Sequence, residues 1–172
     1  MIQNYKEKSP AVDKSCFTDD SAIIIGDVHL SENCSVWPNA TIRGDMAAIR
    51  IGKNSNIQDN CVVHVNSGME TVIEDNVTVG HGAILHACTI ESHVLIGMGA
   101  IVLDQAVIGE YSLVAAGALV PPRKVFPPRS MIMGNPAKVV RQLTDKEVED
   151  IEKNCSHYVS LAAEYREEQK KG

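Results

Sequence analysis

A hexapeptide repeat runs through most of this chain: an apolar residue, usually Ile, Val or Leu, returns at every sixth position, often with a small residue four places later. Segments 90–95, 96–101 and 108–113 show the repeat most cleanly. The positions of this register, all apolar except Thr18, are Val12, Thr18, Ile24, Leu30, Val36, Ile42, Ile51, Ile57, Val63, Ile73, Val79, Leu85, Ile90, Ile96, Val102, Ile108, Val114 and Val120. A unit this short cannot bury its apolar face alone, so only stacking of many copies makes a continuous core.

The repeat predicts an all-β solenoid, a parallel β-helix of about six triangular coils with three apolar positions in each coil. A helical period of about 3.6 residues does not persist between residues 12 and 120, which excludes helical and doubly wound folds there. Aromatic residues make up only 4% of the chain, as expected for a core of stacked β-branched side chains. Asn and Gly fall between the apolar positions, where corners require left-handed backbone.

A different pattern follows the last repeat. Pro121-Pro122 and Pro127-Pro128 predict an extended connector, and Thr144-Asp145-Lys146-Glu147 matches the capping box of a helix N-terminus. Apolar residues at helical spacing come next. We therefore expect a β-helix over 1–126, and over 127–172 a connector and one C-terminal α-helix that packs back on the solenoid.

The repeat is interrupted three times, always after the third face of a coil. Two interruptions are insertions, which predict loops at 43–50 and 64–72, and the third shortens the interval after Leu85 by one residue. Insertions in a solenoid form loops on one side, which is often the binding side. We expect the functional site on this side of the molecule.

Three histidines lie beside these loops. His64 and His86 each follow a core position of the third face, one coil apart. Neighbouring strands lie ~4.8 Å apart, so both imidazoles can approach one metal ion with bonds of ~2.0–2.1 Å. His81 falls on the second face, around a corner. A complete three-histidine site therefore requires a trimer about an axis parallel to the solenoid, with His81 supplied by a neighbouring subunit.

Three histidine ligands and one open position are typical of a catalytic zinc, whose bound water has a pKa of about 7. Polar residues share the same registers: Arg43 lies one coil below His64, and Asp59 one coil below the third histidine. Gln58 adjoins Asp59, and Asp45 lies in the first loop. The Gln58 amide can orient the hydroxide, and the Arg and Asp side chains can pair across the interface.

Other features exclude several classes of partner. The net charge of −6 and the lack of a basic stripe argue against nucleic acid. The sequence shows neither an apolar leader nor a membrane-length apolar run, so we expect a cytoplasmic protein. The five cysteines lack the paired spacing of a metal site, and the four interpreted as packing residues are Cys16, Cys34, Cys61 and Cys155. The remaining histidines, interpreted as solvated surface side chains, are His29, His93 and His157.

Five motifs together carry a family resemblance. They are Arg43-Gly44-Asp45, Asn56-Ile57-Gln58-Asp59-Asn60, His64, Gly80-His81-Gly82-Ala83-Ile84-Leu85-His86 and Gly134-Asn135-Pro136-Ala137-Lys138. They span nearly the whole chain, which resembles the gamma-class carbonic anhydrase family of hexapeptide-repeat proteins. The resemblance implies a left-handed β-helix, a hand that the spacing alone does not supply. It also implies a homotrimer with interfacial zinc, or iron or cobalt, that reversibly hydrates CO2 to bicarbonate.

The resemblance also implies residue roles. The metal ligands would be His64 and His86 from one subunit and His81 from its neighbour. Gln58 would hold the metal-bound water with support from Asn56. The polar residues tied to the interface and to bicarbonate would be Arg43, Asp45 and Asp59.

Two departures from the family pattern concern proton transfer. Met46 stands where well-known active members have an acidic residue, and the loop 65–70 lacks the longer acidic insertion that serves them as a proton shuttle. Tyr158 could supply a hydroxyl near the site, as a tyrosine does in some short members. We expect low activity that depends on external buffer.

Other function classes stay open. A hexapeptide-repeat acyltransferase acting on coenzyme A esters uses one histidine as a base and needs no metal. A thioester hydrolase acting on the same esters would use the same metal hydroxide. A non-catalytic trimer could serve as a subunit of a larger assembly. Metal content separates the acyltransferase from the metal-dependent enzymes, and turnover separates both from the non-catalytic trimer.

Overall fold

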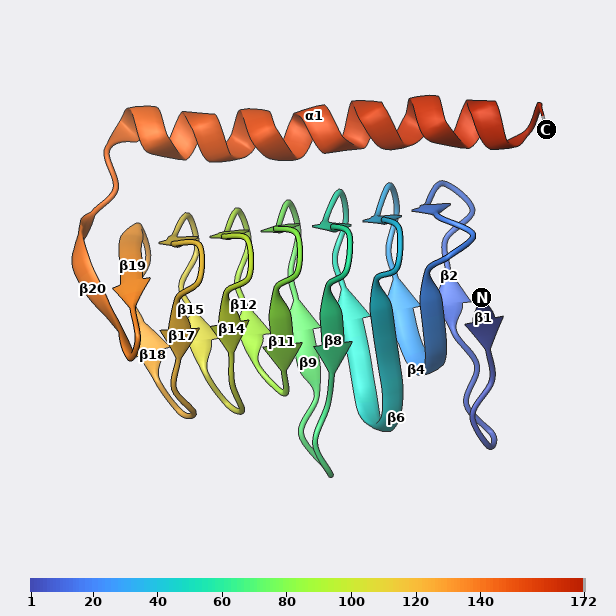
Figure 1. Ribbon diagram of the computed structural model, residues 1–172, viewed down its shortest axis with the longest axis horizontal. Coiled ribbons are helices and arrows are strands. Elements are labelled where there is room, and N and C mark those ends of the chain that lie inside the picture. Colours follow the sequence, from blue (N-terminus) through green and yellow to red (C-terminus); the bar gives the residue numbers. More distant parts are fainter. Residues whose placement is uncertain (172) are drawn as a thin grey trace.

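The computed structural model describes residues 1–171 and shows a parallel β-solenoid of about seven turns with one C-terminal helix (Figure 1). The predicted fold class is confirmed, with about one turn more than expected. Strands on each face pair in parallel with the equivalent strands of the coils before and after. The repeat therefore acts as the sequence predicts, and each apolar position lies in a strand.

Each coil contributes a strand to each of three faces. The first face contains β2 (Ala11–Val12), β9 (Thr71–Ile73), β12 (Thr89–Ile90), β15 (Val107–Ile108) and β18 (Val125–Phe126). The second face contains β3 (Phe17–Thr18), β5 (Ser35–Val36), β7 (Asn56–Ile57), β10 (Thr78–Val79), β13 (Leu95–Ile96), β16 (Leu113–Val114) and β19 (Ser130–Gly134). The third face contains β8 (Val62–His64), β11 (Ile84–His86), β14 (Ile101–Val102) and β17 (Leu119–Val120). The long strands β4 (Ile23–Leu30) and β6 (Thr41–Ile51) bend from the third face to the first, and β1 (Ile2–Gln3) pairs with β4. The predicted loop 43–50 is therefore wrong, because these residues continue the strand β6 and pair with β4.

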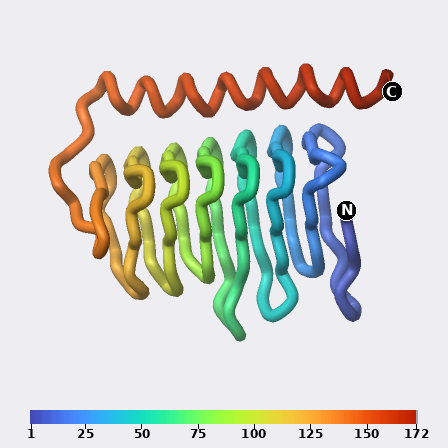
Figure 2. The backbone as a smooth tube through the Cα atoms, in the orientation of Figure 1, coloured from blue at the N-terminus to red at the C-terminus, as the bar shows by residue number. Residues whose placement is uncertain are grey.

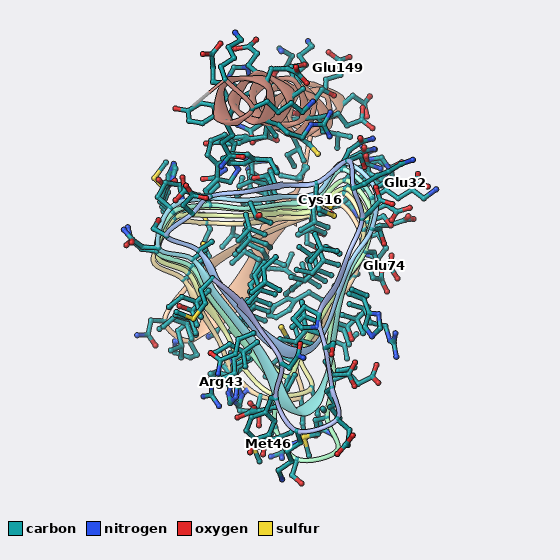
Figure 3. The ribbon with its side chains drawn as sticks, turned by 90° about the vertical axis from the view of Figure 1, so that its right-hand side faces the viewer. Cys16, Glu32, Arg43, Met46, Glu74 and Glu149 are labelled. Atoms are coloured by element: carbon teal, nitrogen blue, oxygen red, sulfur yellow. The ribbon has the colours of Figure 1, made fainter. Side chains whose placement is uncertain are left out.

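The direction of winding is visible from the N-terminal end (Figure 3). The chain passes Cys16 at the start of the second face, Arg43 on the third, Met46 at the bend of β6, and Glu74 on the first face. It turns counter-clockwise in this view as it recedes from the viewer. The solenoid is therefore left-handed, as the family resemblance implies.

The interior consists of stacked columns of apolar side chains. On the third face, the column residues are all 0% exposed: Ile24, Ile42, Val63, Leu85, Val102 and Val120. The corner asparagines adopt left-handed backbone with φ of 58–60°: Asn33, Asn39, Asn54, Asn60 and Asn76. Asn tolerates this conformation better than most residues, so the corners can be tight. All five cysteines lie in the described part of the chain and are free, and four of them are buried.

The solenoid continues beyond the predicted boundary at residue 126. Phe126 pairs with Ile108, and Ile132 pairs with Val114, so the six-residue spacing persists for another turn. The two proline pairs lie at corners between short strands, where a missing N–H does not break a ladder. β20 (Ala137–Gln142) then pairs antiparallel with β19 and ends the sheet.

The helix α1 (Asp145–Gln169) lies along the second face, over β3, β5, β7 and β10 (Figure 2). The predicted capping box is present, because Thr144 accepts from the Glu147 N–H and Glu147 accepts from the Thr144 N–H. The buried side chains of the helix are Ile151, Cys155 and Ala162. Within residues 1–171, no helix is both long enough and apolar enough to cross a membrane.

His93 differs from the expectation of a solvated side chain. Its ring stacks on that of Tyr111, with 4.5 Å between centroids and 13° between planes. Its Nδ1 lies 3.4 Å from a carboxylate oxygen of Glu152 on α1. The docked helix thus converts a surface histidine of the bare solenoid into a contact between the helix and the solenoid.

Gly109 and Gly117 provide a matched test of packing between coils. A Cβ on Gly109 would lie 2.6 Å from the Pro128 nitrogen and 2.7 Å from the Phe126 carbonyl oxygen, whereas a Cβ on Gly117 would meet nothing within 4 Å. Gly117 has φ of +67°, so alanine there carries only the local strain of left-handed backbone, ~1–2 kcal/mol. We expect Gly109→Ala to lower the free energy of unfolding by about 3 kcal/mol or more, measured by urea denaturation. Equal losses in the two variants would contradict this packing.

Candidate metal centre

The third face lines up three polar side chains at one of its edges. Arg43, His64 and His86 are register neighbours on β6, β8 and β11. Each follows a core residue that points inwards, so each points away from the core. Figure 3 shows Arg43 outside the triangle, close to the corner formed by the loops.

His64 and His86 face each other. Nδ1 of His64 lies 3.2 Å from Nε2 of His86. The opposite nitrogen of each ring contacts a carboxylate: Nε2 of His64 lies 3.0 Å from Asp45 Oδ1, and Nδ1 of His86 lies 2.5 Å from Asp104 Oδ1. An ionised carboxylate can only accept, so each ring donates its proton to its own aspartate. The two facing nitrogens are then both unprotonated, and each carries a lone pair.

Two lone pairs at 3.2 Å repel each other unless a proton or a cation lies between them. A tetrahedral zinc with bonds of ~2.0–2.1 Å holds two ligand nitrogens ~3.3 Å apart. Metal-binding histidines typically donate their other N–H to a carboxylate, which sets the tautomer and the ring orientation. The His64–His86 pair therefore fits half of a zinc site.

His81 lies in the corner turn between β10 of the second face and β11 of the third, at the opposite edge of the third face from His64 and His86. Its Nδ1 is 2.8 Å from Asp59 Oδ2, which leaves Nε2 as a free lone pair. Among the His, Cys, Asp and Glu side chains of residues 1–171, no group of three comes together as a metal site. The structure brings His64 and His86 together and leaves His81 apart from them.

Two buried side-chain amides, those of Gln58 and Asn56, form a hydrogen-bonded chain beside His81. The Gln58 Oε1 accepts from the His81 backbone N–H at 3.2 Å, and the Gln58 Nε2 donates to Asn56 Oδ1 at 3.1 Å. Asn56 in turn donates to the Thr78 hydroxyl at 3.0 Å. Gln58 is 3% exposed and its orientation is set by these bonds. One N–H of its amide group remains available to a ligand beside His81.

Arg43 and Asp45 form an ion pair within one chain. Burial raises the pKa of Asp45, but hydrogen bonds from His64 and Arg43 outweigh that effect and hold the pKa below its usual value. Asp45 therefore stays ionised and able to accept from His64. Met46 follows at the bend of β6 and is 50% exposed (Figure 3).

Tyr158 lies close to His81. Together with Gln58 and His81 it lines a largely apolar cavity of about 270 Å³ between α1 and the second face. Burial raises the pKa of Tyr158, and the negative charge of Asp59 raises it further. Its ring also packs edge-on against Trp37, with 5.5 Å between centroids. Tyr158 therefore keeps its proton at neutral pH and can act as a hydrogen-bond donor.

The sequence reasoning missed Asp104 and Asn66. Asp104 Oδ2 accepts from Asn66 Nδ2 at 2.8 Å, while Oδ1 accepts from His86. The Asn66 bond is the main cause of a lowered Asp104 pKa, and the His86 bond adds to it. A signal was available, because Asp104 follows Val102 by two positions, the offset that places Asp59 after Ile57.

The left-handed solenoid defines a hexapeptide-repeat protein. Its third face carries a polar site, in which each histidine of the pair contacts a carboxylate. The family described as "Bacterial transferase hexapeptide (six repeats)" matches residues 87–122. A carbonic anhydrase of Geobacillus kaustophilus is 44% identical over 166 residues, which cover 96% of this chain and 91% of the relative. The chain belongs to the gamma-class carbonic anhydrase family.

Two further comparisons bear on the function. The mitochondrial gamma carbonic anhydrase 1 of Arabidopsis thaliana is 42% identical over 176 residues, covering 99% of this chain but only 64% of the plant protein. The chain therefore spans less than two thirds of that relative's length. The crystal structure of a Bacillus cereus protein, described as a candidate acetyltransferase, matches with a TM-score of 0.96 and 44% identity over 97% of both chains.

Proposed function

We propose that this protein reversibly hydrates CO2 to bicarbonate with a zinc-type ion, or iron or cobalt, held at the interfaces of a homotrimer. The observation that carries the proposal is the His64–His86 pair, whose facing nitrogens are 3.2 Å apart and whose other nitrogens each contact a carboxylate. His81 would complete the ligand set from the neighbouring subunit. Its Nδ1 contacts Asp59, so its Nε2 is left unprotonated and able to bind the ion.

The outer surface of the third face supports the trimer. One register row on this face is mostly apolar and consists of Thr41, Val62, Ile84, Ile101 and Leu119. Val62 and Ile84 are 39% and 37% exposed in the single chain. This row lies between the edge that carries His81 and the edge that carries His64 and His86. Burying it against another subunit would bring the two half-sites together.

The residues of the chain supply orientation and charge. The metal, when bound, supplies a Lewis acid and a water of lowered pKa. The free N–H of Gln58 would orient the attacking oxygen, and Arg43 would attract the bicarbonate anion. The apolar wall of the cavity beside Tyr158 would accept CO2.

Metal analysis of anaerobically purified protein, together with a CO2 hydration assay, tests the proposal. About one zinc-type ion per chain with measurable hydration is the expected result. Metal without hydration would favour thioester hydrolysis at the same site. A protein with no metal and no turnover would be interpreted as a non-catalytic trimer.

Acyl transfer is a second candidate, because of the similarity to the candidate acetyltransferase and because the His81–Asp59 pair also suits a general base. That chemistry needs one histidine and no metal. Transfer of an acyl group from a coenzyme A ester by metal-free protein would support it over CO2 hydration.

Proton export is expected to limit turnover. Each hydration must release a proton to the buffer, and the half-exposed Met46 cannot carry one. We expect Met46→Glu to raise the hydration rate several-fold at low imidazole concentration and little at high concentration. Stopped-flow measurement over a buffer series checks this. Fast wild-type hydration that does not depend on buffer would show that another residue, such as Glu70 or Tyr158, already carries the proton.

A further inference from the structure

We infer that Asp104 and Asn66 are positioning residues for the metal site: Asn66 holds Asp104, and Asp104 holds the His86 ring as its Nδ1–H tautomer with Nε2 directed at the ion. The inference rests on the proposed function, because the ion is the one proposed there. It places two residues in the site that neither the repeat register nor the family resemblance assigned.

The first step is the contact between His86 and Asp104. The two atoms, Nδ1 and Oδ1, are 2.5 Å apart, and both side chains are partly buried. Neutral imidazole in water prefers the proton on Nε2, which would block the nitrogen that faces His64. A carboxylate on the Nδ1 side reverses that preference and raises the basicity of the opposite nitrogen.

The second step is the contact between Asp104 and Asn66. The Asn66 Oδ1 accepts from the Ser67 backbone N–H at 2.8 Å, so its NH2 group must point the other way. That group donates to Asp104 Oδ2 at 2.8 Å. Backbone hydrogen bonds of 2.9 and 3.3 Å between Asn66 and Met69 close the turn that carries the amide. The loop 64–72 therefore orients Asp104 through one side chain.

The third step compares the carboxylates of Asp45 and Asp104. Asp45 is shared between His64 and the cationic Arg43, whereas among the ion pairs within residues 1–171 Asp104 faces only His86. A cation beside a carboxylate reduces the negative potential that reaches its histidine. Asn66 is neutral, so it orients Asp104 without reducing the negative potential at His86. Asp104 is therefore expected to influence its histidine more strongly than Asp45 does.

The test compares four variants in the full-length protein: Asp104→Asn, Asp104→Ala, Asn66→Ala and the control Asp13→Ala. Asp13 bonds to Ser15 at another corner of the solenoid. Zinc affinity is measured by competition with a chromophoric chelator. We expect Asp104→Ala to weaken zinc binding by about 10- to 100-fold, Asp104→Asn and Asn66→Ala by less, and Asp13→Ala not at all.

A second readout separates positioning from folding. Nitrogen-15 NMR of the imidazole rings in metal-free protein reports the tautomer of His86. We expect Nδ1–H in the wild type and a shift towards Nε2–H in Asp104→Ala. If the alanine variant fails to fold, the near-isosteric Asp104→Asn still carries the affinity measurement.

The possible failures are distinguishable. A wild-type protein that binds no zinc would overturn the proposed function itself. A wild type that binds zinc while Asp104→Ala binds it equally well, or an unchanged His86 tautomer in that variant, would overturn only the role of Asp104. Equal losses in Asp13→Ala and Asp104→Ala would assign the effect to general destabilisation and would also overturn it.

Discussion

The His81→Ala variant is expected to purify with less than about a tenth of the wild-type metal and to lose at least ~100-fold in CO2 hydration, since losing a direct ligand exceeds the 10- to 100-fold cost of losing a supporting residue. The chain itself brings only His64 and His86 together. Two histidines leave a zinc ion without the third protein ligand of a catalytic site. Elemental analysis and stopped-flow hydration measure both effects.

His157→Ala is the matched control. His157 is exposed on α1, and its ring contacts Tyr158, so the substitution changes a histidine near the site but not a proposed ligand. We expect its metal content to equal that of the wild type. Full metal occupancy in His81→Ala would disprove the ligand assignment.

The second large effect is complementation between inactive chains. A His64→Ala subunit keeps His81, and a His81→Ala subunit keeps the His64–His86 pair. In a cyclic trimer that contains both, one of the three interfaces joins an intact pair to an intact His81. Random mixing by co-expression or joint refolding should therefore restore about a quarter of the wild-type metal sites. Metal content and hydration rate should recover together.

Mixing His64→Ala with His86→Ala is the control for that experiment. Both subunits keep His81, but neither keeps a complete histidine pair, so no interface can be restored. Recovery in this control would show that the metal site does not need both His64 and His86 from one subunit. Failure of the His64→Ala and His81→Ala mixture, in trimers shown to be mixed by mass, would place His81 within its own chain's site.

The sequence by itself determined the fold class. A period of six residues specifies which residues stack, because each apolar position must lie above its counterpart in the next coil to be buried. The same arithmetic made His64 and His86 neighbours and placed Arg43 beside them, as the structure shows. It also separated His81 from the pair, because His81 lies around the corner between the second and third faces.

The spacing alone could not supply the hand of the coil or the extra turn. Both hands bury the same residues, so the left-handed winding came from the family resemblance and is visible in the path of the chain (Figure 3). The prolines near Phe126 and Ile132 suggested a break. Corner positions tolerate proline, so the core column continued through both residues.

Only the tertiary structure decided how the site is supported. A register gives the position of a residue along one dimension, whereas the contact of Asp104 with His86 depends on a side chain that reaches back one coil. The turn of an irregular loop orients the Asn66 amide, and Tyr158 lines the cavity beside His81 only because α1 docks on the second face. Loop conformation and helix docking depend on many weak contacts at once, and a repeat period contains no information about them.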